Sequence, residues 1–260
     1  MPAHDAPRSS TPGADDRRVV VLVVPATGTW APPGRDPEAW RLALAEDTYE
    51  VLAALDRVDV AIAVVHTNDR ATDAQAADAR TTDARTTDDR AVDGRAADDQ
   101  AADGRAADGR AADAAVAEIA ALTWPGTPVY SVDSTQPVLD AIAFAGPAAA
   151  VVAVSHDVPD LPGLLIGKLF RALSSADLAV TPASDGTLAA IGVNLPTADW
   201  VTAAAPTFDT PLATLESLKP RRHALAIGPG WHRLRSPADI AQLDPGLEGW
   251  HSTKSLLRHN

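Results

Sequence analysis

The chain has 260 residues, no cysteine and a formal net charge of −13. The missing cysteines exclude disulfide bonds and thiolate metal sites, and an acidic chain without a basic stripe is not expected to bind nucleic acid. No apolar run is long enough to cross a bilayer, and no signal peptide precedes Val19. We therefore expect a cytoplasmic protein that does not contact membranes.

The first part of the chain predicts a strand, a ligand-facing loop and a helix. Residues 1–18 are rich in Pro, Ser, Gly and Asp and predict a disordered leader. The run from Val19 to Val24 predicts a buried strand. Asp36 and Pro37 predict a helix start, and that helix extends to about Leu55. The loop after the first strand is made of small residues that would let a nucleotide approach its backbone, and a tight turn explains them equally well: Pro25, Ala26, Thr27 and Gly28.

A low-complexity segment interrupts the domain at residues 67–113. It follows a predicted strand at 58–66 and repeats an Asp-x-Arg/Gln-small-small unit. A period of five matches neither a helix nor a strand, so no apolar stripe forms. Such a segment cannot bury enough surface to offset the entropy of ordering it, and we expect a disordered, solvent-exposed insertion.

The second half continues the alternation of strands and helices. Strands are predicted at 128–132, 148–155, 178–181, 188–193 and 224–227, with helices between most of them. This alternation predicts an α/β fold, in which a mostly parallel central sheet carries helices on both faces. The link between 181 and 188 is too short for a crossover helix, so one local departure from the parallel pattern is expected. One domain, residues 19–243, would then precede a tail at 244–260.

Two aspartates stand at predicted strand ends, where ligands bind in open α/β sheets. Asp157 follows the strand at 148–155, and Asp185 follows the strand at 178–181. Asp157 is harder to explain as a cap, because it lies further from the start of the next helix. Asp160 is well placed to cap that helix, and a catalytic role is the alternative for it. Asp209, followed by Thr210 and Pro211, similarly predicts a helix cap.

The segments VVAVSHDVPDLP and DLAVTPASDGTLAAIGV resemble the nucleotide-diphospho-sugar transferase (GT-A-like) superfamily. They are most similar to a branch related to arsenosugar-biosynthesis glycosyltransferases, which the helix ALAEDTYEVLAAL also resembles. A more distant likeness is to the guanylyltransferases of coenzyme F420 and molybdenum-cofactor synthesis. The likeness covers Val19 to His66 and about Ala114 to Leu243, and it leaves out the repeat segment.

The resemblance implies a site that holds a nucleotide and a metal. Asp157 would bind Mg²⁺ or Mn²⁺, whose charge offsets that of a leaving diphosphate. Asp185 and Gly186 would line the cleft, and the loop at 25–28 would lie against the nucleotide. Arg35, Arg221 or Arg222 would stand in for phosphate-binding residues, because the first loop lacks the lysine and arginine typical of the family.

Two functions follow from these observations. One is a metal-dependent glycosyl- or nucleotidyltransferase that uses a nucleoside-diphosphate sugar or nucleoside triphosphate and a small-molecule acceptor. The alternative is a degenerate member of the same fold that binds a ligand or acts as a scaffold without catalysis. The missing lysine and arginine of the first loop favour this alternative. A dinucleotide-binding enzyme and a serine hydrolase are disfavoured, since neither a GxGxxG nor a GxSxG motif is present.

Overall fold

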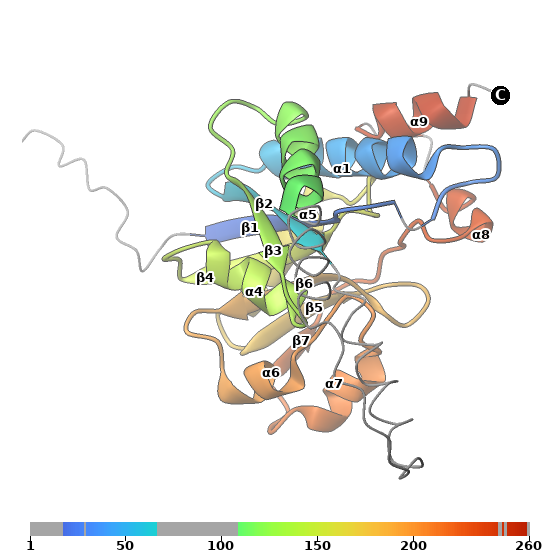
Figure 1. The fold of residues 1–260 in the computed structure, drawn as a ribbon. Helices are drawn as coiled ribbons and strands as arrows, with labels where there is room; N and C mark the ends of the chain where they lie inside the picture. The colour runs from blue at the N-terminus through green and yellow to red at the C-terminus, as the bar shows by residue number, and fades with distance from the viewer. Residues whose placement is uncertain (1–17, 29, 67–108, 244–245, 247–248, 259–260) are drawn as a thin grey trace, which may run out of the picture.

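The computed structural model describes residues 18–28, 30–66, 109–243, 246 and 249–258. Most of the predicted leader and of the repeat insertion lies outside these residues. Within them the chain forms one seven-stranded sheet with the order β3-β2-β1-β4-β6-β5-β7, with helices on both faces (Figure 1). The predicted α/β fold class is confirmed.

The first half of the sheet is parallel. β1 (Arg18–Pro25) lies between β2 (Asp59–His66) and β4 (Ala150–Ser155), and β3 (Val129–Asp133) lies beyond β2 at the edge. All six residues of β4 are buried, as expected for a strand covered on both faces. The carboxyl ends of β1, β2 and β4 therefore meet at one edge of the sheet.

The second half contains the predicted departure from parallel order. β6 (Leu188–Asn194) is antiparallel to both of its neighbours, β4 and β5 (Leu178–Pro182). β7 (Leu225–Ile227) then pairs with β5 in parallel. The short 183–187 link forces the hairpin between β5 and β6, and β6 separates β4 from β5. Asp157 and Asp185 consequently do not follow neighbouring strands.

Alternate residues of β1 enter two separate cores. Val20, Leu22 and Val24 pack toward α1 (Pro37–Ala53), a helical stretch at 109–121, and α5 (Gly163–Ala172). Val19, Val21 and Val23 pack toward the other helices, which are α4 (Pro137–Phe144), α6 (Asp199–Ala204) and α7 (Leu212–Leu218). This alternation is the period of two that a strand imposes on its side chains.

The C-terminal segment is helical and returns to the first helix. It contains α8 (Pro237–Ile240) and α9 (His251–Arg258), and α9 lies along α1 (Figure 1). Asp47 on α1 accepts hydrogen bonds from the backbone N–H groups of Ser252 (3.0 Å) and Thr253 (2.7 Å). Asp47 thus caps α9 from another helix, because the first N–H groups of a helix lack partners within it.

A third core joins this C-terminal segment to the start of α1. It consists of Trp40, Leu44, Leu234, Leu243 and Trp250. Trp30 packs edge-on against Trp40, with ring centroids 6.0 Å apart. In the part of the chain that the structure describes, no helix is long and apolar enough to cross a membrane.

Candidate functional site

A cavity of about 440 Å³ opens at the carboxyl ends of β1, β2 and β4. Pro25, Val65 and the segment Ser155–Asp157 mark these strand ends in its wall. The remaining lining residues come from β1, from α1 and its preceding loop, from α4 and from two later loops; they are Val23, Trp30, Trp40, Arg41, Leu44, Pro137, Val138, Thr207, Phe208, Asp209, Arg233, Leu234 and Arg235. Ligands of open α/β sheets bind at such an edge.

Asp157 forms a buried ion pair with Arg233. The Nε of Arg233 donates to both carboxylate oxygens of Asp157, at 2.9 and 3.1 Å. The two side chains are 6% and 7% exposed. Burial by itself would raise the pKa of Asp157, but the Arg233 charge and hydrogen bonds hold the pKa below its ordinary value. Asp157 is therefore ionised and already neutralised by a protein cation.

The rest of the Arg233 guanidinium connects three other segments. Nη1 donates to the backbone carbonyl of Phe208 at 2.9 Å and lies 3.4 Å from that of Leu188. Nη2 donates to the Oγ of Ser155 at 3.3 Å. Because these partners come from β4, β6 and the loop before α7, Arg233 fixes the floor of the cavity.

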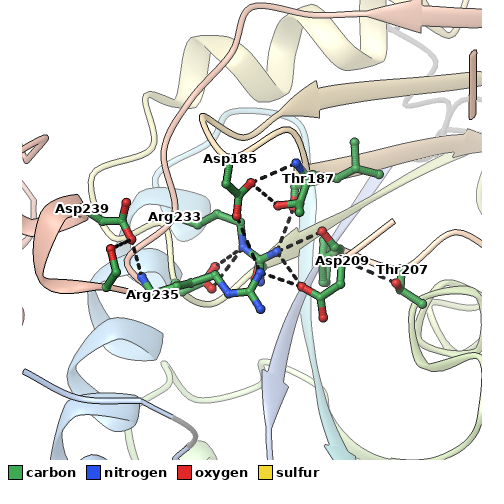
Figure 2. A network of polar contacts seen from close by, with 12 residues as sticks. Asp185, Thr187, Thr207, Asp209, Arg233, Arg235 and Asp239 are labelled. Atoms are coloured by element: carbon green, nitrogen blue, oxygen red, sulfur yellow. Dashed lines mark hydrogen bonds and ion pairs between the residues drawn. The ribbon is translucent and has the colours of Figure 1, made fainter. Parts of the chain in front are cut away.

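Arg235 links the predicted residue Asp185 to the rim of the cavity (Figure 2). Its Nη1 lies 2.7 Å from Oδ1 of Asp209 and 3.8 Å from Oδ2 of Asp185. Asp185 also accepts hydrogen bonds from the N–H and hydroxyl of Thr187, which hold its pKa low against partial burial. Asp185 does not line the cavity; it orders the β5–β6 turn beside it.

The predicted cap at Asp209 is wrong. Pro211 occupies the N-cap position of α7, and no side chain caps that helix. Asp209 pairs with both Arg235 and Arg233, and its side chain is 65% exposed. Gly186 adopts φ +86°, and its carbonyl accepts from Leu212 N–H, so this glycine shapes the turn.

The predicted cap at Asp160 is also wrong. Pro162 is the N-cap residue of α5, and no side chain caps that helix. Oδ1 of Asp160 instead accepts from the indole Nε1 of Trp231 at 3.1 Å and lies 3.0 Å from Nε2 of His232. A tertiary contact with a distant loop takes the carboxylate away from the helix start.

The predicted nucleotide-facing stretch at 25–28 is held by α1 and contributes one residue to the cavity wall, Pro25 at the end of β1. The Pro25 carbonyl accepts from Nη1 of the buried Arg41 at 3.2 Å, and Ala26 N–H donates to Val65. The Gly28 N–H donates to Glu38, and a Cβ on Gly28 would lie 2.3 Å from the Pro37 carbonyl oxygen.

The other five predicted nucleotide contacts do not line the cavity; they are Ala26, Thr27, Gly28, Arg35 and Gly186. The Nη2 of Arg35 points to the carbonyl of Leu257 in α9, at 3.5 Å. Arg35 therefore helps to attach the C-terminal helix. In the described part of the chain, the loop after β1 brings no cation into the cavity.

His156 lies beside Asp157 in the cavity wall and is neutral near pH 7. Burial lowers its pKa to about 4, with the Asp157 charge acting in the opposite direction. The carbonyl of His156 accepts a hydrogen bond from the hydroxyl of Thr48 at 2.9 Å. Thr48 on α1 therefore positions the backbone from which Asp157 projects.

A divalent cation does not fit this arrangement at Asp157. Both carboxylate oxygens face the Nε of Arg233, and the side chain is enclosed. Among the described residues, no three His, Asp or Glu side chains come together as metal ligands. Mg²⁺ and Mn²⁺ need oxygen ligands that are not already paired with a protein cation. The metal role of Asp157 stays a prediction that requires Arg233 to move away.

Sequence reasoning missed the three arginines that build the site. Arg233 and Arg235 are two residues apart in an extended segment, which places both side chains on one side of the chain. This R-x-R spacing is the one signal that the sequence offered. For Arg41 the sequence carries no signal, because an arginine within a helix is ordinarily exposed. In the structure Arg41 is 1% exposed.

Comparison with solved structures identifies the fold. A protein assigned as a nucleotide-diphospho-sugar transferase from Desulfovibrio desulfuricans G20 matches with a TM-score of 0.57 and 16% identity, over 94% of this chain and 95% of its own. The 4-diphosphocytidyl-2C-methyl-D-erythritol synthase of Anaerococcus prevotii DSM 20548 matches with a TM-score of 0.48 and 11% identity, over 94% of this chain and 97% of its own. No family model and no curated protein matches the sequence.

These findings establish the class of fold. The chain has the nucleotide-diphospho-sugar transferase (GT-A-like) fold, as the sequence resemblance implied. At 16% identity the likeness concerns the fold and not the activity. The relation to the arsenosugar branch stays a prediction.

Proposed function

We propose that this chain is a ligand-binding protein that uses the cavity of a transferase fold without metal-dependent transfer. Its ligand would be a nucleotide-related small molecule: a nucleoside, a nucleotide or a nucleotide sugar. The observation that carries the proposal is the buried Asp157–Arg233 pair, in which a guanidinium takes the position that a metal would need.

The size and the position of the cavity support ligand binding. A volume of about 440 Å³ lies within the range of small-molecule sites, roughly 300–1,000 Å³. The cavity lies at the sheet edge where this class of fold binds its ligands. Two aromatic side chains of the wall, the half-buried Trp30 and the largely buried Phe208, lie where a flat ring could contact them.

The absence of phosphate-binding groups in the first loop supports a non-catalytic role. Transfer from a nucleoside diphosphate or triphosphate develops negative charge on the leaving group, and that charge needs a cation. Arg41 and Arg233, which are almost fully buried, have carboxylate partners already. Arg235, which is 41% exposed at the rim, pairs with Asp209 and Asp185, so each described arginine of the cavity wall already has a carboxylate partner.

A metal-dependent transferase is the second candidate. It is favoured by the position of Asp157, which follows the central strand β4 and lies in the cavity wall. For this function Arg233 would have to leave Asp157 when the donor and metal bind, and Asp157 would become the metal ligand. Asp185, Gly186 and the 25–28 loop would then act at the periphery of the donor site.

A thermal-shift screen separates the two candidates. The purified protein is tested against nucleosides, nucleotides and nucleotide sugars, each with and without Mg²⁺ or Mn²⁺. The proposed binding function predicts stabilisation that does not depend on metal, about 2.7 kcal/mol at a hundredfold excess over the Kd. Stabilisation that needs both metal and a diphosphate, and that disappears in Asp157→Asn, would favour the transferase. No stabilisation by any compound would contradict both.

A further inference from the structure

A second concave site, the aromatic groove, lies at the amino ends of the strands, opposite the cavity. Its volume is about 540 Å³, and its aromatic walls include Trp124, Tyr130 and Phe144. Val19 of β1 and Asp59 at the start of β2 also line it, which places it at the beginning of the parallel strands. The aromatic groove is therefore separate from the candidate ligand site.

Two aromatic side chains of this groove are open to solvent. Trp124 is 63% exposed and Phe144 is 58% exposed. Among the described residues, the other large apolar side chains with comparable exposure lie outside the groove; they are Leu164, Leu218 and Ile227. A single exposed apolar side chain is ordinary, whereas two accessible rings in one concave surface indicate a docking site.

The contacts around Trp124 and Phe144 hold the groove in place. The N–H of Trp124 donates to the hydroxyl of Tyr49 at 3.0 Å, and this hydroxyl lies 2.7 Å from Oγ1 of Thr127. The ring of Phe144 packs against Tyr130, with centroids 5.3 Å apart. Because the groove is already formed, a segment that docks there does not have to order its walls, and this favours binding.

The N-terminal segment, residues 1–17, joins the folded domain at the aromatic groove. The segment lies outside the described residues, and it continues into Arg18, the first residue of β1, beside Val19 in the groove wall. In the extended polyproline II conformation each residue adds about 3.1 Å, so 17 residues span about 50 Å. This length is enough to cross a groove of about 540 Å³.

The composition of the segment matches the aromatic walls. It has no aromatic residue and three prolines, which are Pro2, Pro7 and Pro12. Proline-rich segments dock in aromatic-lined grooves, because the polyproline II conformation is already populated before binding and loses little entropy. Tethering also raises the local concentration of such a segment to the order of millimolar, so a weak contact suffices.

We infer that residues 1–17 dock their prolines on the aromatic groove of the same chain and cover Trp124 and Phe144. The leader that the sequence predicts to be disordered would then be ordered in part by an intramolecular contact. This inference does not depend on the function proposed for the cavity, because the groove and the cavity lie at opposite ends of the parallel strands.

Fluorine NMR of the full-length protein tests the docking at Trp124. All six tryptophans are labelled with 5-fluorotryptophan, and Trp124→Phe identifies the resonance of Trp124. In Pro7→Gly/Pro12→Gly this resonance should shift and its solvent isotope effect should increase, because the ring becomes uncovered. The matched control, Ser9→Gly/Ser10→Gly, adds two glycines to the same segment but keeps its prolines, and it should leave the resonance unchanged. A Trp124 resonance that is the same in all three proteins would overturn the inference.

Trypsin cleavage after Arg8 tests the docking from the side of the segment. In the full-length variant Trp124→Ala/Phe144→Ala the cleavage rate should rise at least about threefold, because the protease acts on the undocked population. The variant should fold, since both side chains are more than half exposed. The matched control, Leu164→Ala/Leu218→Ala, removes two exposed apolar side chains elsewhere and should leave the rate unchanged. Equal rates in the native protein and the groove variant would contradict the docking.

A second copy of the chain is the competing occupant of the groove. Sedimentation velocity and the Trp124 resonance are therefore measured over the same range of protein concentrations. Intramolecular docking predicts a monomer whose Trp124 resonance does not depend on concentration. If the resonance and the sedimentation coefficient change together, the groove is an interface between two copies, and the inference is wrong.

Discussion

Replacing Arg233 with methionine should strongly destabilise the protein. Methionine keeps most of the side-chain length but leaves Asp157 enclosed without a partner. Breaking a buried pair by removing one member costs about 3–5 kcal/mol, because an uncompensated charge stays behind. The Phe208 carbonyl also loses its 2.9 Å donor. For a domain of this size the loss corresponds to a Tm decrease on the order of 10 °C.

The loss of stability in Arg233→Met should depend on pH, because it depends on whether Asp157 is protonated. Burial raises the pKa of Asp157, and in the native protein the Arg233 charge outweighs burial and keeps the pKa low. Native stability from this pair is therefore present above about pH 4, the ordinary aspartate range, and is lost as the pH falls through the depressed pKa. In Arg233→Met burial alone raises the pKa, so the destabilisation is largest near pH 7. It should diminish as the pH falls and Asp157 becomes protonated.

Urea unfolding at pH 7 and at pH 5 measures both effects. The double variant Arg233→Met/Asp157→Leu should recover most of the loss, since an apolar pair can replace a buried ion pair. The matched control is Arg221→Met, which breaks the 2.7 Å pair with Asp177. Arg221 is 60% exposed, so that change should cost about 1 kcal/mol or less. A loss in Arg233→Met no larger than in the control, or one that does not depend on pH, would refute the reasoning.

Three further predictions concern the elements around the cavity. Asp47→Ala should cost about 1–2 kcal/mol and increase amide exchange in α9, because two N–H groups of that helix lose their acceptor; unchanged exchange would contradict the docking by Asp47. Gly28→Ala should destabilise by about 1–3 kcal/mol through the clash with the Pro37 carbonyl, whereas Gly167→Ala, in open space on α5, should stabilise by up to about 1 kcal/mol. His156, with a pKa of about 4, should show no imidazole titration between pH 5 and pH 8 by NMR.

The strands were predictable because each is a continuous run of small and β-branched apolar residues. The predicted strand from Val19 to Val24 lies within β1, and the predicted run at 148–155 contains β4. The short link before Leu188 predicted the antiparallel hairpin of β5 and β6, and the structure contains it. These features depend on local sequence, where hydrophobic pattern and link length decide the outcome.

The site was less predictable because its contacts join distant segments. Asp157 and Arg233 are 76 residues apart, and no local pattern pairs them. The position of Asp160 before a helix predicted a cap, but its carboxylate instead accepts a hydrogen bond from Trp231, 71 residues away. The position of β6 between β4 and β5 also separates Asp185 from Asp157, and strand order cannot be read from the strands themselves.

The central claim is that Arg233, and not a metal ion, neutralises Asp157. Titration of the full-length protein with Mn²⁺, followed by electron paramagnetic resonance with and without cytidine 5′-diphosphate, tests it most directly. We predict no stoichiometric Mn²⁺ uptake in the native protein under either condition. Uptake of one Mn²⁺ per chain that is lost in Asp157→Asn would contradict the claim and restore the metal-dependent transferase.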